Sequence, residues 1–152
     1  MNIALIEPFF TGSHKSWALE LKEHLPHQID IYSMKGRFWK WRMLGAAIEL
    51  SRQFNANSKQ YDLILATSLL DVGHFIALSR RKLLNTPVHM YFHENQLTYP
   101  WSKNDRDVEL KREKFYGLIN VKSALASDKV YFNSAYHMES FLKAAHLLLK
   151  EV

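Results

Sequence analysis

Two polar loops in this 152-residue chain carry residue types that can bind and transform a ligand. The first, residues 8–14 with the sequence PFFTGSH, follows an apolar run and precedes a helical pattern. Gly12 allows the backbone to approach a ligand closely, and Ser13 with the free amides of a helix start can bind hydroxyl, phosphate or carboxylate oxygens. We predict substrate binding by Thr11, Gly12, Ser13 and His14. The alternative is an ordinary strand-to-helix turn capped by Ser13.

The second loop, residues 93–100 with the sequence HENQLTYP, is the denser group of polar side chains. A histidine side chain has an unperturbed pKa of about 6.5, so His93 can donate or accept a proton near pH 7. Glu94 could orient His93 or bind a sugar hydroxyl. We predict His93 and Glu94 as catalytic residues and Asn95 and Gln96 as substrate-binding residues. The alternative is a surface turn whose polar groups only contact water.

Five short apolar runs are the elements that must position these loops. They cover residues 2–7, 28–32, 62–66, 88–92 and 129–132 and alternate with helical patterns. Strands separated by helices pair in parallel through right-handed crossovers, and continuously apolar strands are typical of a sheet covered on both faces. We predict a doubly wound, Rossmann-like α/β domain of three layers (αβα) with a mainly parallel sheet of about five strands. Ligands bind such sheets where the strand order reverses, expected here between the first and fourth strands, with the two loops facing each other.

Helical periodicity predicts the other elements and their buried faces. The first helix is expected to begin after Ser13 and to end at Pro26, and the second covers residues 37–55. The third covers residues 72–84, the fourth residues 108–126, and the last begins near Asn133 and Ser134. The core stripe of the second helix is predicted to consist of Trp41, Leu44, Ile48 and Phe54. The buried side of the fourth is predicted to consist of Val108, Phe115, Leu118, Ile119 and Leu125.

Residues 35–42, with the sequence KGRFWKWR, combine four cations with three aromatic rings. Basic groups neutralise phosphates and flat rings stack on unpaired bases, so this composition suits a single-stranded loop of RNA. If Trp41 lies on the core stripe, Trp39 points outward with Arg42. We therefore predict nucleic-acid contacts by Lys35, Arg37, Trp39 and Arg42. The alternative is a helix start with one buried tryptophan and one packed against a neighbouring domain.

Composition and missing motifs exclude several classes of function. The absence of cysteine removes disulfides, thiolate metal sites and cysteine nucleophiles, and fits a reducing, cytoplasmic location. The net charge of +5 permits a polyanionic partner such as RNA. Neither G-x-G-x-x-G nor a P-loop is present, which argues against an NAD enzyme or an ATPase. The first apolar run is broken at Glu7, so it is neither a signal peptide nor a membrane span.

A metal-dependent mechanism is not expected. Asp105 and Asp107 spell the D-x-D motif of metal-dependent glycosyltransferases. They open a predicted helix, however, where the helix dipole favours acidic residues in any case. We therefore predict no metal site and no cofactor.

Three segments together resemble the amino-terminal domain of tRNA-queuosine α-mannosyltransferases. They are EPFFTGSH (residues 7–14), KGRFWKWR (residues 35–42) and FHENQLTYP (residues 92–100), and the resemblance runs across nearly the entire chain. Asn133 and Ser134, just past the fifth strand, are similar to the family's pattern and join the expected binding residues. The resemblance implies a GT-B enzyme of two Rossmann-like domains. Residues 1–152 would form the single amino-terminal, acceptor-side domain, and the carboxy-terminal domain that binds GDP-mannose would be absent.

The resemblance also implies a reaction: transfer of mannose from GDP-mannose, with retained configuration and without a metal, to queuosine in a tRNA anticodon. His93 resembles the histidine that lies beside the donor sugar in related enzymes, and Gly12 resembles the glycine near the donor phosphates. Without the second domain this chain is expected to be inactive. The apolar end of the chain suggests that the natural polypeptide continues past Val152, the alternative being a native last helix packed on the sheet.

Two other functions fit the same residues. One is a non-catalytic α/β module that binds RNA through the basic aromatic segment. The other is a GT-B domain that acts on a small-molecule or glycan acceptor.

Overall fold

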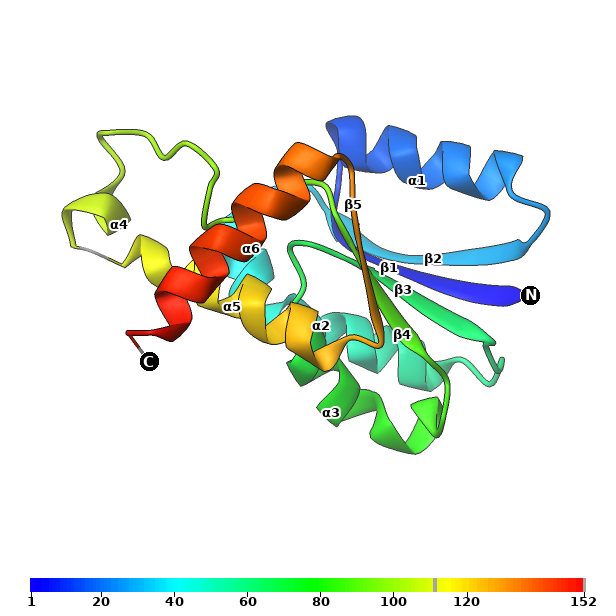
Figure 1. Cartoon of the computed structure of the whole chain (residues 1–152). Helices are drawn as coiled ribbons and strands as arrows, with labels where there is room; N and C mark the ends of the chain where they lie inside the picture. Colours follow the sequence, from blue (N-terminus) through cyan, green and yellow to red (C-terminus); the bar gives the residue numbers. More distant parts are fainter. Residues whose placement is uncertain (111, 152) are drawn as a thin grey trace.

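The computed structural model describes residues 1–110 and 112–151, which form an α/β domain around a five-stranded, fully parallel sheet (Figure 1). The strands are β1 (Asn2–Phe10), β2 (Gln28–Lys35), β3 (Leu63–Thr67), β4 (Val88–Phe92) and β5 (Lys129–Phe132). The helices are α1 (Gly12–His24), α2 (Trp39–Ala56), α3 (Val72–Leu83), α4 (Arg106–Glu109), α5 (Glu113–Ala126) and α6 (Ala135–Leu149). The predicted fold class is confirmed.

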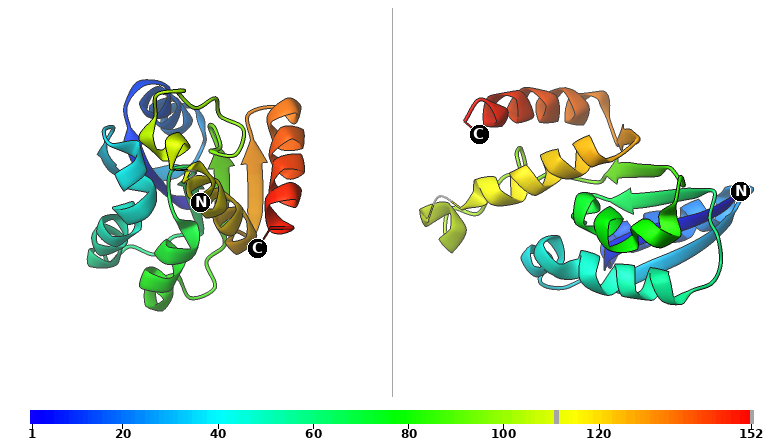
Figure 2. Two further views of the ribbon diagram at one scale, coloured as in Figure 1. Left: turned by 90° about the vertical axis from the view of Figure 1, so that its left-hand side faces the viewer. Right: turned by 90° about the horizontal axis from the view of Figure 1, so that it is seen from below.

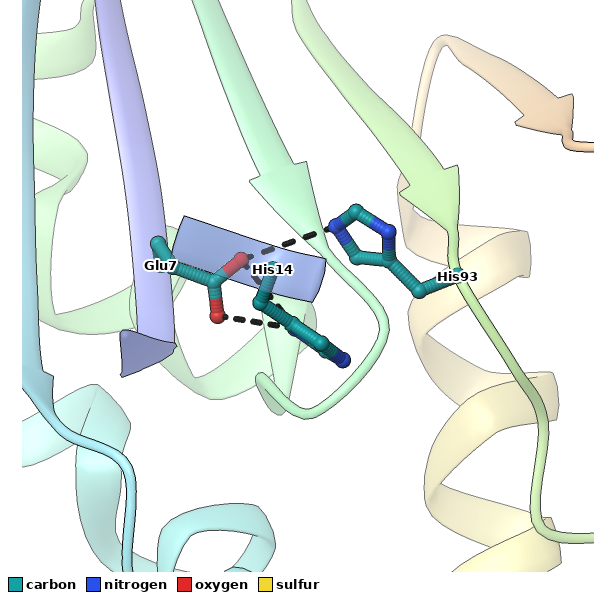
Figure 3. A group of neighbouring side chains, drawn as sticks. All are labelled: Glu7, His14 and His93. Atoms are coloured by element: carbon teal, nitrogen blue, oxygen red, sulfur yellow. Dashed lines mark hydrogen bonds and ion pairs between the residues drawn. The ribbon is translucent and has the colours of Figure 1, made fainter. Parts of the chain in front are cut away.

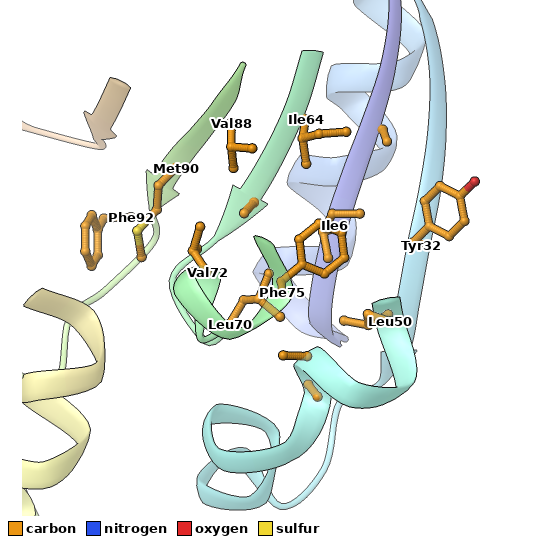
Figure 4. Close-up of a cluster of buried hydrophobic side chains, with 14 of the residues drawn as sticks. Ile6, Tyr32, Leu50, Ile64, Leu70, Val72, Phe75, Val88, Met90 and Phe92 are labelled. Atoms are coloured by element: carbon orange, nitrogen blue, oxygen red, sulfur yellow. The ribbon is translucent and has the colours of Figure 1, made fainter. Parts of the chain in front are cut away.

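Helices lie on both faces of the sheet, as Figures 1 and 2 show. Successive residues of a strand point to opposite faces. Ile3 and Leu5 of β1 therefore pack with Ala18 of α1, whereas Ile6 of β1 faces the larger core under α2 and α3 (Figure 4). Helix α5 lies on the same side as α3, and α6 runs beside α5 along the β5 edge. This arrangement gives the predicted three layers.

The strand order is β2-β1-β3-β4-β5, so the predicted place of the reversal is wrong. The third strand in sequence pairs directly with β1, which puts the reversal between β1 and β3 rather than between the first and fourth strands. Apolar periodicity marks where strands lie in the sequence but does not determine which strands become neighbours. The loop after β4 therefore reaches the crevice from one strand further away.

Helix α2 buries a different face from the one predicted. Trp41, Leu44 and Ile48 are 72%, 53% and 60% exposed, and of the predicted stripe only Phe54 is buried. The buried face carries Met43, Ala46, Ala47, Leu50, Ser51 and Phe54. The small alanines let the helix approach the sheet closely. The positions of the larger apolar residues therefore did not predict its buried side.

The predicted fourth helix is divided into α4 and α5, and its buried side also differs from the prediction. Phe115 and Leu125 are exposed, Val108 and Leu118 are half-buried, and Ile119 is buried as predicted. The buried positions of α5 include the polar residues Asn120 and Ser123. A Cβ atom at Gly117 would collide with the Leu97 side chain, so glycine is needed where α5 passes under the loop after β4.

The helix starts agree with the sequence in most cases. Ser134 caps α6 by accepting a hydrogen bond from the His137 amide, at 3.1 Å. Helix α1 differs from the prediction because it begins at Gly12 after Thr11, so Ser13 lies inside the helix and is not its cap. Gly12 adopts a positive φ of 51°, a left-handed conformation that glycine adopts at little cost.

Among the described residues, no helix is both long and apolar enough to span a bilayer.

Candidate functional site

The predicted first loop is formed by the end of β1 and the start of α1, with only Thr11 between them. It meets the loop after β4 at one cavity of about 540 Å³, at the carboxyl ends of the strands. The predicted residues that line it are Thr11, Gly12, Ser13, His14, Trp39, Glu94 and Gln96. Phe9, Leu69, Tyr99, Trp101 and Asp105 contribute to its other walls. The expectation that the loops face each other is confirmed, whereas the roles assigned to their residues stay predictions.

A second hollow of about 320 Å³ lies on the other side of the loop after β4. His93, Asn95, Asn133 and Ser134 line this hollow and do not line the larger cavity, whereas Glu94 lines both. The structure thus divides the predicted site residues between two adjoining hollows that share Glu94.

Sequence reasoning missed the buried carboxylate at the centre of the site. Glu7 of β1 is fully buried, and each of its two carboxylate oxygens lies 3.3 Å from Nδ1 of His14 (Figure 3). The backbone amide of Phe9 donates a hydrogen bond to Glu7 Oε1 at 2.8 Å. Nε2 of His93 lies 3.7 Å from Glu7 Oε2 and forms no hydrogen bond among the described residues. The available signal was a charged residue inside an apolar strand.

His14 is held between two carboxylates. Its Nδ1 faces Glu7, and its Nε2 lies 3.2 Å from Oε2 of Glu94. Burial opposes the charged form, but the hydrogen bonds to Glu7 and Glu94 outweigh burial and raise the pKa of His14 to about 9. Burial also opposes the charged form of Glu7, yet the hydrogen bond to His14 leads the opposing interactions and lowers the pKa of Glu7 to about 2. At neutral pH the site therefore contains an imidazolium between carboxylates.

The ring of His93 is fixed by aromatic neighbours. It packs on the His14 ring with a centroid distance of 4.1 Å. The Trp17 and Tyr91 rings pack against it in T-shaped geometry, with centroid distances of 4.7 and 4.9 Å. The side-chain amide of Asn133 donates a hydrogen bond to the carbonyl oxygen of His93 at 2.9 Å. Both backbone and ring are therefore oriented before any ligand binds.

Two predicted binding residues are used to build the loop after β4. Asn95 is buried, and its Oδ1 accepts hydrogen bonds from the amides of Leu97 and Thr98, both at 3.0 Å. The backbone amide of Gln96 donates a hydrogen bond at 2.7 Å to Oδ1 of Asn120. Nδ2 of Asn120 in turn donates a hydrogen bond to the Ser68 carbonyl oxygen at 2.8 Å. The polar residues buried in α5 thus connect this loop to the end of β3.

Trp39 points away from the three cations that were predicted to bind nucleic acid with it. Lys35 and Arg37 are exposed, and Arg42 donates hydrogen bonds to the Lys35 carbonyl oxygen. Trp39 instead packs against Trp101, with a centroid distance of 5.4 Å, and lines the larger cavity. The predicted outward direction of Trp39 is wrong because α2 is rotated relative to the expected face.

A metal ion would find donors in the cluster of Glu7, His14 and His93, whose ligand atoms lie within 4.8 Å of one another. Two imidazoles and one carboxylate form a donor set that zinc uses in proteins. The raised pKa of His14 opposes this use, because a ligating imidazole must lose its proton. Asp105 and Asp107 are the ion-pair partners of Lys40, which explains the D-x-D sequence without a metal.

The charge on His14 makes the stability of the domain depend on pH. Because its folded-state pKa is raised from 6.5 to about 9, its contribution is complete below pH 6.5 and is lost as the pH rises through 9. We expect the free energy of unfolding to fall by roughly 3 kcal/mol across this window, since one pKa unit corresponds to about 1.4 kcal/mol. Hydrogen exchange at β1 amides of the full-length protein, corrected for intrinsic rates, measures this change. His14→Gln should flatten the profile, and an equally steep profile in that variant would contradict the assignment.

The fold is that of a Rossmann-like domain with two adjoining hollows at the carboxyl edge of its sheet. Residues 2–152 match the family described as "tRNA-queuosine alpha-mannosyltransferase N-terminal", and the chain belongs to this family. It is 37% identical over 142 residues to a Drosophila melanogaster protein named tRNA-queuosine alpha-mannosyltransferase. The match covers 93% of this chain but only 36% of the length of that relative. No solved structure matches the chain significantly.

Proposed function

We propose that this chain is the acceptor-side domain of an enzyme that transfers mannose from GDP-mannose to queuosine in tRNA. The observation that carries the proposal is the larger cavity, where the start of α1 and the loop after β4 converge around the His14 imidazolium. The name of the Drosophila relative supports the acceptor and the sugar. A tRNA acceptor and a nucleotide-sugar donor are compatible with a cytoplasmic location.

The chemistry at this site requires breaking the bond between the mannose anomeric carbon and the phosphate oxygen. A bond to an acceptor hydroxyl oxygen forms, GDP leaves, and the hydroxyl proton is released. The backbone amides of Gly12 and Ser13 at the start of α1 are suited to bind a negatively charged phosphate, and Thr11 precedes them on the wall of the same cavity. We assign to Glu94 a hydrogen bond to a sugar or acceptor hydroxyl, because its carboxylate lines both hollows.

His93 is proposed to lie beside the donor sugar. Its ring is fixed by Trp17, Tyr91 and His14. His93 lines the smaller hollow, which shares Glu94 with the larger cavity. Asn133 and Ser134 border the same hollow, and Asn133 also orients the backbone of His93. A carboxy-terminal domain that binds the nucleotide would complete this half-site from the other side.

The test is transfer of labelled mannose from GDP-mannose by the full-length protein. We expect product with tRNA that contains queuosine and none with the same tRNA that contains guanosine at that position. The 152-residue chain alone should be inactive. Transfer to a glycan instead of tRNA would favour a different acceptor, and tRNA binding without any transfer would favour a non-catalytic RNA-binding module; either result would overturn the proposal.

A further inference from the structure

Two large aromatic side chains are exposed at the start of α2. Phe38 is 69% exposed and Trp41 is 72% exposed, and neither belongs to a hydrophobic cluster formed by the described residues. Phe38 has a left-handed backbone with φ 55° and ψ 56°, which is unfavourable for a bulky residue. Unfavourable backbone conformations often occur where a protein binds a ligand. Packing therefore does not explain this pair.

Three cations, Lys35, Arg37 and Arg42, flank the two rings in the sequence. The guanidinium of Arg37 lies 5.9 Å from the centroid of the Phe38 ring, and Arg42 Nη2 donates a hydrogen bond to the Lys35 carbonyl oxygen at 3.1 Å. Among the described residues, none of these three cations forms an ion pair. Lys40, in contrast, is neutralised by aspartates of the α4 segment. The outer side of the helix start therefore combines open positive charge with flat apolar rings.

This surface adjoins the larger cavity. A Cβ atom at Gly36 would collide with the Thr11 side chain, so the turn before α2 is pressed against a residue that lines the cavity. Trp39, next to Phe38 in sequence, lines the same cavity from the inner side of the helix start. A polymer bound along Phe38 and Trp41 would thus be placed beside the cavity mouth.

We propose that Phe38 and Trp41 form a stacking platform for unpaired nucleotides of the tRNA acceptor, with Lys35, Arg37 and Arg42 holding its phosphates. The identity of the RNA rests on the proposed function. Bases stack on aromatic rings, and cations beside the rings bind the phosphates that connect those bases. A protein partner would instead use the whole exposed stripe, which continues along α2 through Leu44 and Ile48. Among the described residues, the cations of this stripe that form no ion pair lie at its aromatic end, because Arg52, one turn beyond Ile48, is paired with Glu49. This distribution of charge favours RNA.

Binding of queuosine-containing tRNA to variants of the full-length protein tests the platform. We expect Trp41→Ala and Phe38→Ala each to weaken binding roughly 5- to 100-fold, the usual range for losing one base-stacking ring. Trp41→Phe should retain most of the affinity. Arg37→Ala should reduce the slope of log K against log salt concentration by about 0.7 to 0.9, the value for one lost phosphate contact. The matched control is Leu44→Ser with Ile48→Ser, which removes apolar side chains that are also more than half exposed and should leave the affinity unchanged.

Unchanged tRNA affinity in Trp41→Ala and Phe38→Ala would overturn the platform. An equal loss of affinity in the control variant with Leu44 and Ile48 replaced would also overturn it, because a general apolar interface would then explain the surface. Failure of the proposed function is a separate result. A wild-type protein that binds tRNA through these rings but transfers no mannose would refute the reaction and support the platform.

Discussion

Replacing His93 by alanine in the full-length protein is expected to slow mannosyl transfer to tRNA by roughly 100- to 10,000-fold, the range for losing a positioned acid or base. Nε2 of His93 faces the buried Glu7 carboxylate, so Nδ1 is the ring nitrogen left to act on the donor sugar, and neighbouring rings hold it in one orientation. Steady-state kinetics should show the loss mainly in kcat. The KM for GDP-mannose should change little if the nucleotide is bound mainly by the other domain.

Two further variants separate a catalytic role of His93 from a packing role. His93→Phe keeps a ring against Trp17 and Tyr91 but removes both nitrogens, so it should be about as inactive as the alanine variant. His24→Ala removes an exposed histidine at the end of α1 and should be as active as the wild type. Recovery of activity in His93→Phe would show that this ring only packs.

The sequence was sufficient for the fold class because buried parallel strands are continuously apolar. The limits of β4 and β5 agree with the predicted residues 88–92 and 129–132. The strand order could not be predicted from the sequence, because the pairing of β3 with β1 depends on where each crossover returns to the sheet. The buried face of α2 was predicted wrongly because the prediction placed the largest apolar residues in the core. In the structure the small residues Ala46 and Ala47 pack against the core, and Trp41 is exposed to solvent.

The candidate site was only partly predictable for a related reason. Loop composition revealed Glu94 and the start of α1, because strand ends in such folds gather at one edge. Glu7 was visible only as a charge inside an apolar strand, and its role depends on two partners, His14 from the following helix and His93 from the loop after β4. A buried carboxylate is costly without such partners, and only the tertiary structure shows that it has them.

Replacing Glu7 by glutamine is expected to destabilise the domain by about 3 to 5 kcal/mol at pH 6, the usual cost of removing one partner from a buried ion pair. The fully buried Glu7 carboxylate faces His14 at 3.3 Å, and glutamine cannot balance the imidazolium charge. In the variant, the pKa of His14 should fall because its nearest buried carboxylate is lost. Hydrogen exchange of β1 amides in the full-length protein should then be faster by roughly two to four orders of magnitude, by the free-energy conversion of about 1.4 kcal/mol per decade.

The matched control is Glu20→Gln, which removes the same charge from an exposed position on α1. It should change the stability by less than about 0.5 kcal/mol, as is usual for surface substitutions. Glu7→Gln should also reduce the alkaline loss of stability, because that loss comes from the proton that Glu7 and Glu94 hold on His14. If Glu7→Gln were as stable as Glu20→Gln and kept the alkaline loss, the ion pair could not be what fixes His14. The organisation of the cavity around His14 would then have to come from Glu94 and aromatic packing alone.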